Sequence, residues 1–351
     1  TNVPMLGKDL MMQAGLLAAA GLFSCARRWR SWAWLGVGLG IVLALIGLGA
    51  RYDAPAAAWP LLALPFLRAP SGKSSIRRYG VIRALALGLV LTLGLSMGLS
   101  RALRPISAAE EFWQLLPMFD LVGMSVAAKQ VLISPDVAQF SQGMNVEELE
   151  LRYNPEYHLG VLYCQPYRNQ GCAPAFRTSL NRDELNHLVH NWLRAIVEHP
   201  AAYLKHRKRV ARRLLGISPK TGKLGKLYYV SAVPHHPLGA EYPPSERSVV
   251  IMNWLDDHVS DAWFRPWLYA LLGCLLLPLA SVRCLRGHSP LALLWLCSGL
   301  GHLLCMIIAT GSSEYRYTVW TTLCVLMAAY QLTFGGRGSK ARCELMTSSA
   351  R

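Results

Sequence analysis

The chain has 351 residues, of which 53% are hydrophobic and only 16% are charged. Soluble domains usually carry about 25% charged residues, so this composition argues against a single soluble domain. The formal net charge is +16. In a soluble protein that excess would point to nucleic acid, but here much of it lies in short loops between apolar runs, and we expect no nucleic acid partner.

Apolar runs of bilayer-crossing length recur along the chain. A spanning helix needs about 20 apolar residues, because the hydrocarbon core is about 30 Å thick, and helices satisfy their own backbone there. The predicted spans are 9–25, 31–50, 53–68, 80–100, 263–283, 289–310 and 317–335. The third is short and contains Pro60 and Pro65, so whether it crosses or re-enters is left open.

Lysine and arginine in the connecting segments predict the orientation, because basic residues concentrate in cytoplasmic loops. With seven spans, four basic segments fall on one side of the membrane: 27–30, 68–78, 283–286 and 337–342. We therefore expect a multi-pass protein of the inner (plasma) membrane. Its N-terminus is expected outside and its C-terminus in the cytoplasm.

The predicted fold class is an all-α polytopic membrane protein with about seven transmembrane helices. The long middle segment exceeds the length of a simple connector, so we expect a mainly α-helical extracytoplasmic domain between spans four and five. The predicted parts are an N-terminal bundle of four spans (1–100), this outer domain (101–262), a C-terminal bundle of three spans (263–336) and a cytoplasmic tail (337–351).

Two helices are predicted inside the outer domain. Residues 181–198 carry apolar residues at helical spacing, and Asn181 with Glu184 resembles a capping box. A second helix begins at Pro200 and ends at Gly216. Its basic face suits the membrane interface, with the apolar side in acyl chains and cations at lipid phosphates; a solvated basic helix is the alternative. The predicted interface residues are Lys205, Arg207, Lys208, Arg209, Arg212 and Arg213.

Of nine cysteines, only Cys164 and Cys172 lie in the predicted outer domain. Two cysteines that close a short loop in an oxidising compartment predict a disulfide. A metal site is the less favoured alternative, because two further ligands at suitable spacing are not evident.

Charged residues at the predicted outer ends of the spans are the main candidates for chemistry, because charge near lipid is costly unless it is used or paired. Arginines there can hold a phosphate, and carboxylates can act as a base or bind a divalent cation. The alternative is that these side chains anchor helix ends at the headgroups. The three groups are Asp9; Arg51, Tyr52 and Asp53; and Glu314, Tyr315, Arg316 and Tyr317.

Asp120 lies in the outer domain, near the predicted membrane surface. Two roles are open for it. With Glu110 and Glu111 it lines the same cavity as the span-end groups, or these residues cap helices or pair with Arg101 or Arg104.

Five short stretches accompany this layout: GKDL, ARYDAPAAAWPLL, FDLVGMS, WLRAIVEHPAAYLKHR and SSEYRY. Layout and stretches together resemble the polytopic glycosyltransferases of the GT-C superfamily, similar in style to bacterial members that decorate cell-surface glycans or lipids. The resemblance implies transfer of a sugar from a polyprenyl-phosphate carrier to a glycan or lipid acceptor, on the outer face of the membrane. Membrane lipids are further expected partners, and a divalent cation is left open as a cofactor.

The resemblance also implies roles for individual residues. Asp9 matches an acidic residue that often lies at the outer end of a later span, and it is the expected catalytic residue here. The main catalytic carboxylate usually lies in the first outer loop, so we expect it in a segment that precedes this sequence. The expected donor-phosphate residues are Arg51, Tyr52, Arg316 and Tyr317, with Asp53 and Glu314 as acidic or metal-binding residues.

Two other functions stay open. A transporter or flippase usually shows inverted repeats and polar residues at mid-membrane; no repeat is visible, and His302 is the clearest mid-span polar residue. A non-catalytic membrane subunit is the other alternative, since the expected catalytic loop is not in this sequence.

Overall fold

The computed structural model describes residues 3–26, 32–67, 74–103, 114–134, 145–155, 180, 182–217, 250, 253–254, 258, 261–286, 288–310 and 316–334. For residues 3–7, 74–79, 152 and 316 it describes the backbone alone. All regular elements among these residues are helices. The chain divides into two compact units: unit 1 comprises Thr1–Leu103, Lys223–Cys305 and Arg316–Arg351, and unit 2 comprises Arg104–Gly222 and Met306–Tyr315.

Five of the described helices are long and apolar enough to cross a membrane. They are Lys8–Ala26 within α1 (Val3–Ala26), α2 (Ala33–Ala50), Gly80–Ala102 within α4 (Ser74–Leu103), α11 (Pro266–Leu285) and α12 (Leu291–Ala309). Each lies within a few residues of a predicted span. These helices indicate a multi-pass integral membrane protein, and the all-helical prediction is confirmed for the described residues.

The third predicted span is a broken segment rather than one helix. A short helix, α3 (Ala54–Ala58), is followed by a 3₁₀ helix, η1 (Leu61–Phe66). Pro60 precedes η1 and Pro65 lies inside it, and proline cannot donate a backbone hydrogen bond. Most of the segment is buried. Its irregular backbone is therefore enclosed by protein, the condition under which such backbone is tolerated at membrane depth.

The seventh predicted span corresponds to α13 (Arg316–Phe334), which is 19 residues long but is not among the five apolar helices. Its buried polar side chains bond to α12. Thr321 donates to the Gly299 carbonyl (2.9 Å), and Trp320 donates from Nε1 to the Ser298 hydroxyl (3.0 Å). Threonines therefore lower the apolarity of α13 while they fix it to its neighbour.

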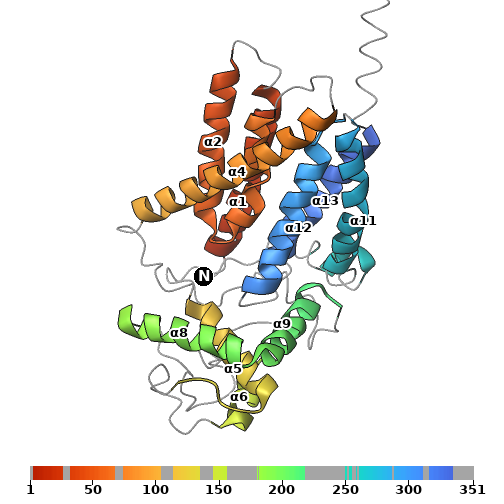
Figure 1. Ribbon diagram of the computed structural model, residues 1–351. Helices are drawn as coiled ribbons and strands as arrows, with labels where there is room; N and C mark the ends of the chain where they lie inside the picture. The colour runs from red at the N-terminus through yellow and green to blue at the C-terminus, as the bar shows by residue number, and fades with distance from the viewer. Residues whose placement is uncertain are drawn as a thin grey trace, which may run out of the picture. The chain divides into compact units, whose positions relative to one another are not determined.

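Helices α1 and α2 pack as an antiparallel pair (Figure 1). Small residues permit their close approach: a Cβ on Gly15 would lie 2.8 Å from a carbonyl oxygen of α2, and one on Gly40 would lie 2.3 Å from the Phe23 ring. Such close packing drives helix association in lipid, because the hydrophobic effect does not bring apolar helices together there. The pairing brings Asp9, in the second turn of α1, to Arg51 just after α2.

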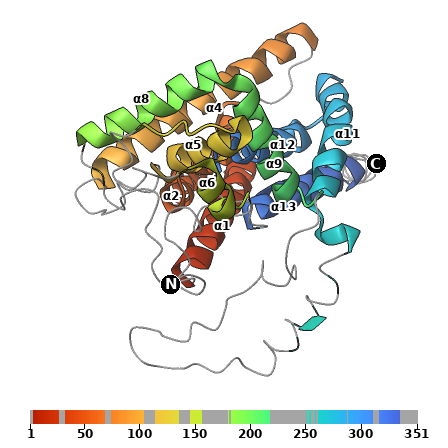
Figure 2. The same cartoon turned by 90° about the horizontal axis from the view of Figure 1, so that it is seen from below.

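The centre of unit 2 is α5 (Leu115–Ala128), which packs against α6 (Val146–Arg152), α8 (Arg182–Glu198) and α9 (Pro200–Leu214) (Figure 2). Residues 117–126 of α5 are all buried. The helix has 14 residues, fewer than the roughly 20 that cross a bilayer. Its apolar surface is therefore covered by its own unit. The predicted helices 181–198 and 200–216 correspond to α8 and α9.

Unit 2 and the predicted outer domain differ at the C-terminal end. The prediction ran from 101 to 262, whereas unit 2 spans Arg104–Gly222 and adds Met306–Tyr315. One contact explains the added segment: Arg207 of α9 donates from Nη1 to the Thr310 carbonyl (2.7 Å). Residues 223–249 lie outside the described part of the chain.

Candidate functional site

Charged side chains gather in unit 1 where α2 ends and α3 begins. Arg51 donates from Nε and Nη2 to the two oxygens of Asp53 (2.7 and 3.1 Å) and from Nη1 to Asp9. His302, in α12, bonds through Nε2 to Asp53 Oδ2 (2.9 Å). We call Asp9, Arg51, Asp53 and His302 the unit 1 cluster.

The local chain path explains the pairing of Arg51 with Asp53. Arg51 ends α2 in an extended conformation, with φ −149° and ψ 144°, and Asp53 directly precedes α3. Pro55 in the first turn of α3 is favourable, because proline has no amide hydrogen to satisfy there. The break between the helices thus places the two side chains within bidentate distance.

The unit 1 cluster is buried. Side-chain exposure is 0% for Asp53, 1% for His302, 8% for Asp9 and 11% for Arg51. Two carboxylates, Asp9 and Asp53, bond to the same guanidinium. Buried charge is costly even when paired, and ionisable groups beside apolar spans commonly mark functional sites.

Arg51 is fully engaged by neighbours of its own unit. All three of its side-chain nitrogens donate to carboxylates, and its guanidinium carbon lies 4.8 Å from the centroid of the Tyr317 ring. A phosphate approaching this guanidinium would meet two carboxylates first. The geometry therefore does not favour the predicted phosphate role of Arg51, and instead favours a role in holding Asp9 and Asp53.

His302 has one ring nitrogen without a partner. Its Nδ1 is buried and makes no hydrogen bond to the described residues. With the proton on Nε2, donated to Asp53, Nδ1 keeps a lone pair that can accept a proton or a hydrogen bond. From the sequence, His302 was identified only as a mid-span polar residue. Its hydrogen bond to Asp53, 249 positions away, is not indicated by any local sequence pattern.

The other predicted site residues are placed as follows. Tyr317 packs on Arg51, whereas Tyr52 is 67% exposed. Arg316 begins α13, but its side chain is outside the described residues, as are Glu314, Cys164 and Cys172. Among the described residues, no group of three or more His, Cys, Asp or Glu is placed to hold a metal ion.

A second buried cluster joins three helices of unit 2. Asp120, on α5, accepts hydrogen bonds from Trp192 Nε1 (3.0 Å), from His206 Nε2 (2.9 Å) and from Arg207. Tyr153, just after α6, donates its hydroxyl to His206 Nδ1 (2.8 Å). We call these five residues the unit 2 cluster.

The unit 2 cluster is balanced in charge. Burial lowers the pKa of His206, against the opposing effect of its hydrogen bond to Asp120, so the imidazole is neutral near pH 7. Its two partners then assign the tautomer, with the proton on Nε2. Burial also raises the pKa of Tyr153. One carboxylate therefore faces one guanidinium, and both histidine nitrogens are bonded.

The position of Arg207 departs from the prediction. It was grouped with exposed interface cations, yet it is 5% exposed and bonded to Asp120. Val210 and Leu214, on the apolar side of α9, are buried within the protein, so these two side chains do not lie in acyl chains. A sequence signal existed: Arg207 falls in the helical stripe with Tyr203, Val210 and Leu214.

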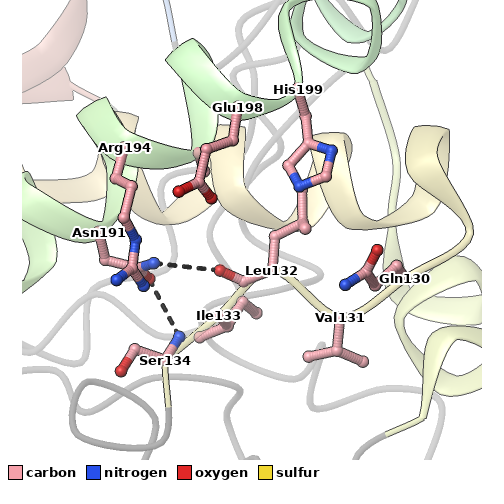
Figure 3. A pocket seen from close by; sticks show the side chains of 10 residues that line it. Gln130, Val131, Leu132, Ile133, Ser134, Asn191, Arg194, Glu198 and His199 are labelled. Carbon is pink, nitrogen blue, oxygen red and sulfur yellow. Dashed lines mark hydrogen bonds between the residues drawn. The ribbon is translucent and has the colours of Figure 1, made fainter.

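Unit 2 also contains a hollow of about 270 Å³ between residues 130–134 and the end of α8 (Figure 3). Asn191 fixes its wall, because its side chain donates to the Leu132 carbonyl (3.2 Å) and accepts from the Ser134 amide (3.0 Å). The rim carries Arg194 and Glu198. One cation and one anion at the rim do not select a ligand of either charge.

The chain has no match among protein-family models, curated proteins or solved structures. Its function is therefore argued from the two clusters themselves.

Proposed function

We propose that this chain is a membrane glycosyltransferase that moves a sugar from a polyprenyl-phosphate carrier to a cell-envelope acceptor, at the outer face of the inner membrane. The unit 1 cluster carries the proposal. Asp9, Arg51 and Asp53, from two separate stretches of the GT-C resemblance, form one bonded group, and Tyr317 from a third stretch packs against it. Side chains that only anchored helix ends at lipid headgroups would not need to bond to one another in this way.

Asp9 is the base of the proposed reaction. Its carboxylate accepts the proton of the acceptor hydroxyl. The acceptor oxygen bonds to the anomeric carbon of the sugar while the bond from that carbon to the carrier phosphate oxygen breaks, and the electron pair leaves on the polyprenyl phosphate. Asp9 is assigned this role because it is more exposed than Asp53, 8% against 0%. Arg51 positions both carboxylates.

A cation is needed to stabilise the negative charge on the departing phosphate. Arg51 is committed to carboxylates, so this role falls to Arg316, the arginine that the resemblance assigns to the carrier phosphate. Tyr317, its neighbour, packs against Arg51. This adjacency in sequence supports the proposal that a phosphate bound by Arg316 would lie near the carboxylates.

Asp9→Asn and Arg316→Ala test this assignment in cells lacking the native gene. Loss of the base in Asp9→Asn typically lowers rates about 100-fold or more, and loss of a charge-stabilising group, as in Arg316→Ala, lowers them by about as much. Both variants are therefore expected to lose the envelope glycan or lipid modification seen with the unaltered chain, measured by mass spectrometry. Asp183→Asn, at an exposed position of α8, is the matched control and is expected to keep it. Unchanged glycans in both site variants would contradict the proposal.

The topology that we propose has seven crossings. Five are the apolar helices, one is α13, and one is the broken α3–η1 segment, with the basic segments in the cytoplasm and residues 104–222 outside. A protease site inserted beside Asp183 tests this orientation. Protease added to intact cells is expected to cut there, and cutting only after the membrane is opened would contradict the topology.

One observation favours a second candidate, a transporter or flippase for lipid or glycan. Asp53 and His302 of the apolar helix α12 form a buried hydrogen-bonded pair, and carboxylate–histidine pairs of this kind serve as proton relays in pumps and transporters. The test is movement of a labelled lipid-linked sugar across proteoliposomes without sugar transfer. Such movement, lost in His302→Gln, would support the transporter over the transferase.

A further inference from the structure

The basic residues of α9 differ in exposure, with Arg209 and Arg213 intermediate. Arg207 is buried and bonded within the unit 2 cluster. Lys205, Lys208 and Arg212 are exposed and lie at spacings of three and four residues, on one side of the helix. We call these three residues the α9 cation face.

Among the residues that the structure describes, no carboxylate pairs with the α9 cation face. The helix itself contains no aspartate or glutamate. Arg209 is not included in this face, because its charge interacts with the carboxylate of Glu150. Like charges at this spacing on a helix repel one another. An external anionic surface would relieve that repulsion.

The structure also limits how α9 can meet a membrane. Ala202, Val210 and Leu214 are buried within the protein, so they are not available for insertion into acyl chains. Beside the cations, Leu204 is the large apolar side chain left exposed on α9, at 66%. Contact with lipid would therefore be electrostatic, at the headgroups, with at most a shallow apolar component.

We infer that the α9 cation face binds the phosphates of anionic phospholipid headgroups. Charge complementarity favours such a surface, and chain connectivity supplies it: α4, a candidate span, ends at Leu103 directly before unit 2, and α11, another, begins at Pro266. Because the chain connects unit 2 to these candidate spans, unit 2 stays close to the bilayer. This inference is independent of the sugar-transfer reaction. Each cation is expected to raise lipid affinity about fivefold.

The test uses the full chain in nanodiscs of phosphatidylcholine, with or without phosphatidylglycerol, and a photoreactive benzoylphenylalanine in place of Leu204. Crosslinks to phospholipid, counted by mass spectrometry, are expected to increase with phosphatidylglycerol. They are expected to decrease as salt rises from about 0.1 M to about 0.5 M, because screening shortens the range of charge interactions.

A pair of matched variants separates the α9 cation face from general charge. Lys208→Gln with Arg212→Gln is expected to weaken the phosphatidylglycerol-dependent crosslinking about 25-fold, the product of two fivefold steps. Arg182→Gln with Arg194→Gln removes two exposed charges from α8 and is expected to leave it unchanged. Equal crosslinking with and without phosphatidylglycerol, or equal loss in both variants, would overturn the inference.

Discussion

Each unit of this protein buries an aspartate, an arginine and a histidine together, yet the two clusters are built differently. In unit 2, Asp120 faces one guanidinium, and His206 is bonded at both nitrogens. In unit 1, Asp9 and Asp53 share one guanidinium, and His302 keeps Nδ1 without a partner among the described residues.

The difference separates a structural network from a site. A charge-balanced network fixes the helices that it joins when its buried polar groups are satisfied. In the unit 2 cluster this holds for Asp120, Trp192 and both nitrogens of His206, while Arg207 Nε is left without a partner among the described residues. In the unit 1 cluster, His302 Nδ1 is a buried proton acceptor without a partner among the described residues, and such a group is kept where chemistry needs it. We therefore assign stability to the unit 2 cluster and reactivity to the unit 1 cluster.

The largest expected effect on stability is that of Asp120→Ala. It leaves Arg207 buried without its carboxylate, and breaking one side of a buried ion pair typically costs about 3–5 kcal/mol. Hydrogen exchange of α9 amides in the full chain measures this as lost protection. Glu198→Ala, at an exposed position at the C-terminal end of α8, is the control and should change stability by under about 0.5 kcal/mol. An equally small effect of Asp120→Ala would contradict the stabilising role assigned to the unit 2 cluster.

Gly123→Ala is expected to have the next largest effect. A Cβ at this position would lie 1.9 Å from His206 Nδ1, so the ring must move and lose its bond from Tyr153. Overpacking of this kind costs about 1–3 kcal/mol. Thermal unfolding of the full chain in detergent measures it. The control is Gly21→Ala in α1, where a Cβ would meet nothing within 4 Å, and it should be neutral or stabilising.

A smaller effect is expected from pH. The pKa of His206 is lowered by burial, whereas an unfolded histidine titrates near pH 6.5. Below that pH the unfolded state binds a proton that the folded state resists. Unit 2 should therefore lose stability as pH falls, by at most about 1.4 kcal/mol per pH unit. No such change is expected from this group above pH 6.5.

Protection of α9 amides at pH 7.5 and 5.5, corrected for intrinsic exchange, measures this loss. His190→Gln, at an exposed position of α8, should leave the pH dependence in place. The groups that face His206 are Asp120, Tyr153, Arg207 and Arg209, and of these only Asp120 is a carboxylate. Protection that rises as pH falls would contradict a neutral, buried His206.

Much of the fold was predictable, because apolar runs and helix caps are local signals. The five candidate spans and the helices α8 and α9 lie within a few residues of their predictions. The third span was harder: Pro60 and Pro65 marked it as irregular, but its enclosure by protein depends on helices distant in sequence. The packing of α13 on α12 through Thr321 was also not predictable, because it depends on a hydrogen bond to a carbonyl of another helix.

The sites were less predictable, because they depend on contacts between distant residues. Asp9 and Arg51 were predictable neighbours, since an antiparallel helix pair brings the start of one helix to the end of the next. Asp120 was expected to line a cavity or pair with Arg101 or Arg104, and its partner is Arg207, 87 positions away. No periodicity links residues at that separation.

The unit 1 cluster takes part in the proposed chemistry, whereas the unit 2 cluster stabilises the fold. The direct test measures envelope glycan transfer and thermal unfolding side by side for Asp9→Asn and Asp120→Asn. We expect Asp9→Asn to lower transfer by about 100-fold or more with an unfolding temperature near that of the unaltered chain, and Asp120→Asn to lower the unfolding temperature itself. Two results would contradict this division of roles: full transfer by Asp9→Asn, or a decrease in its unfolding temperature as large as that of Asp120→Asn.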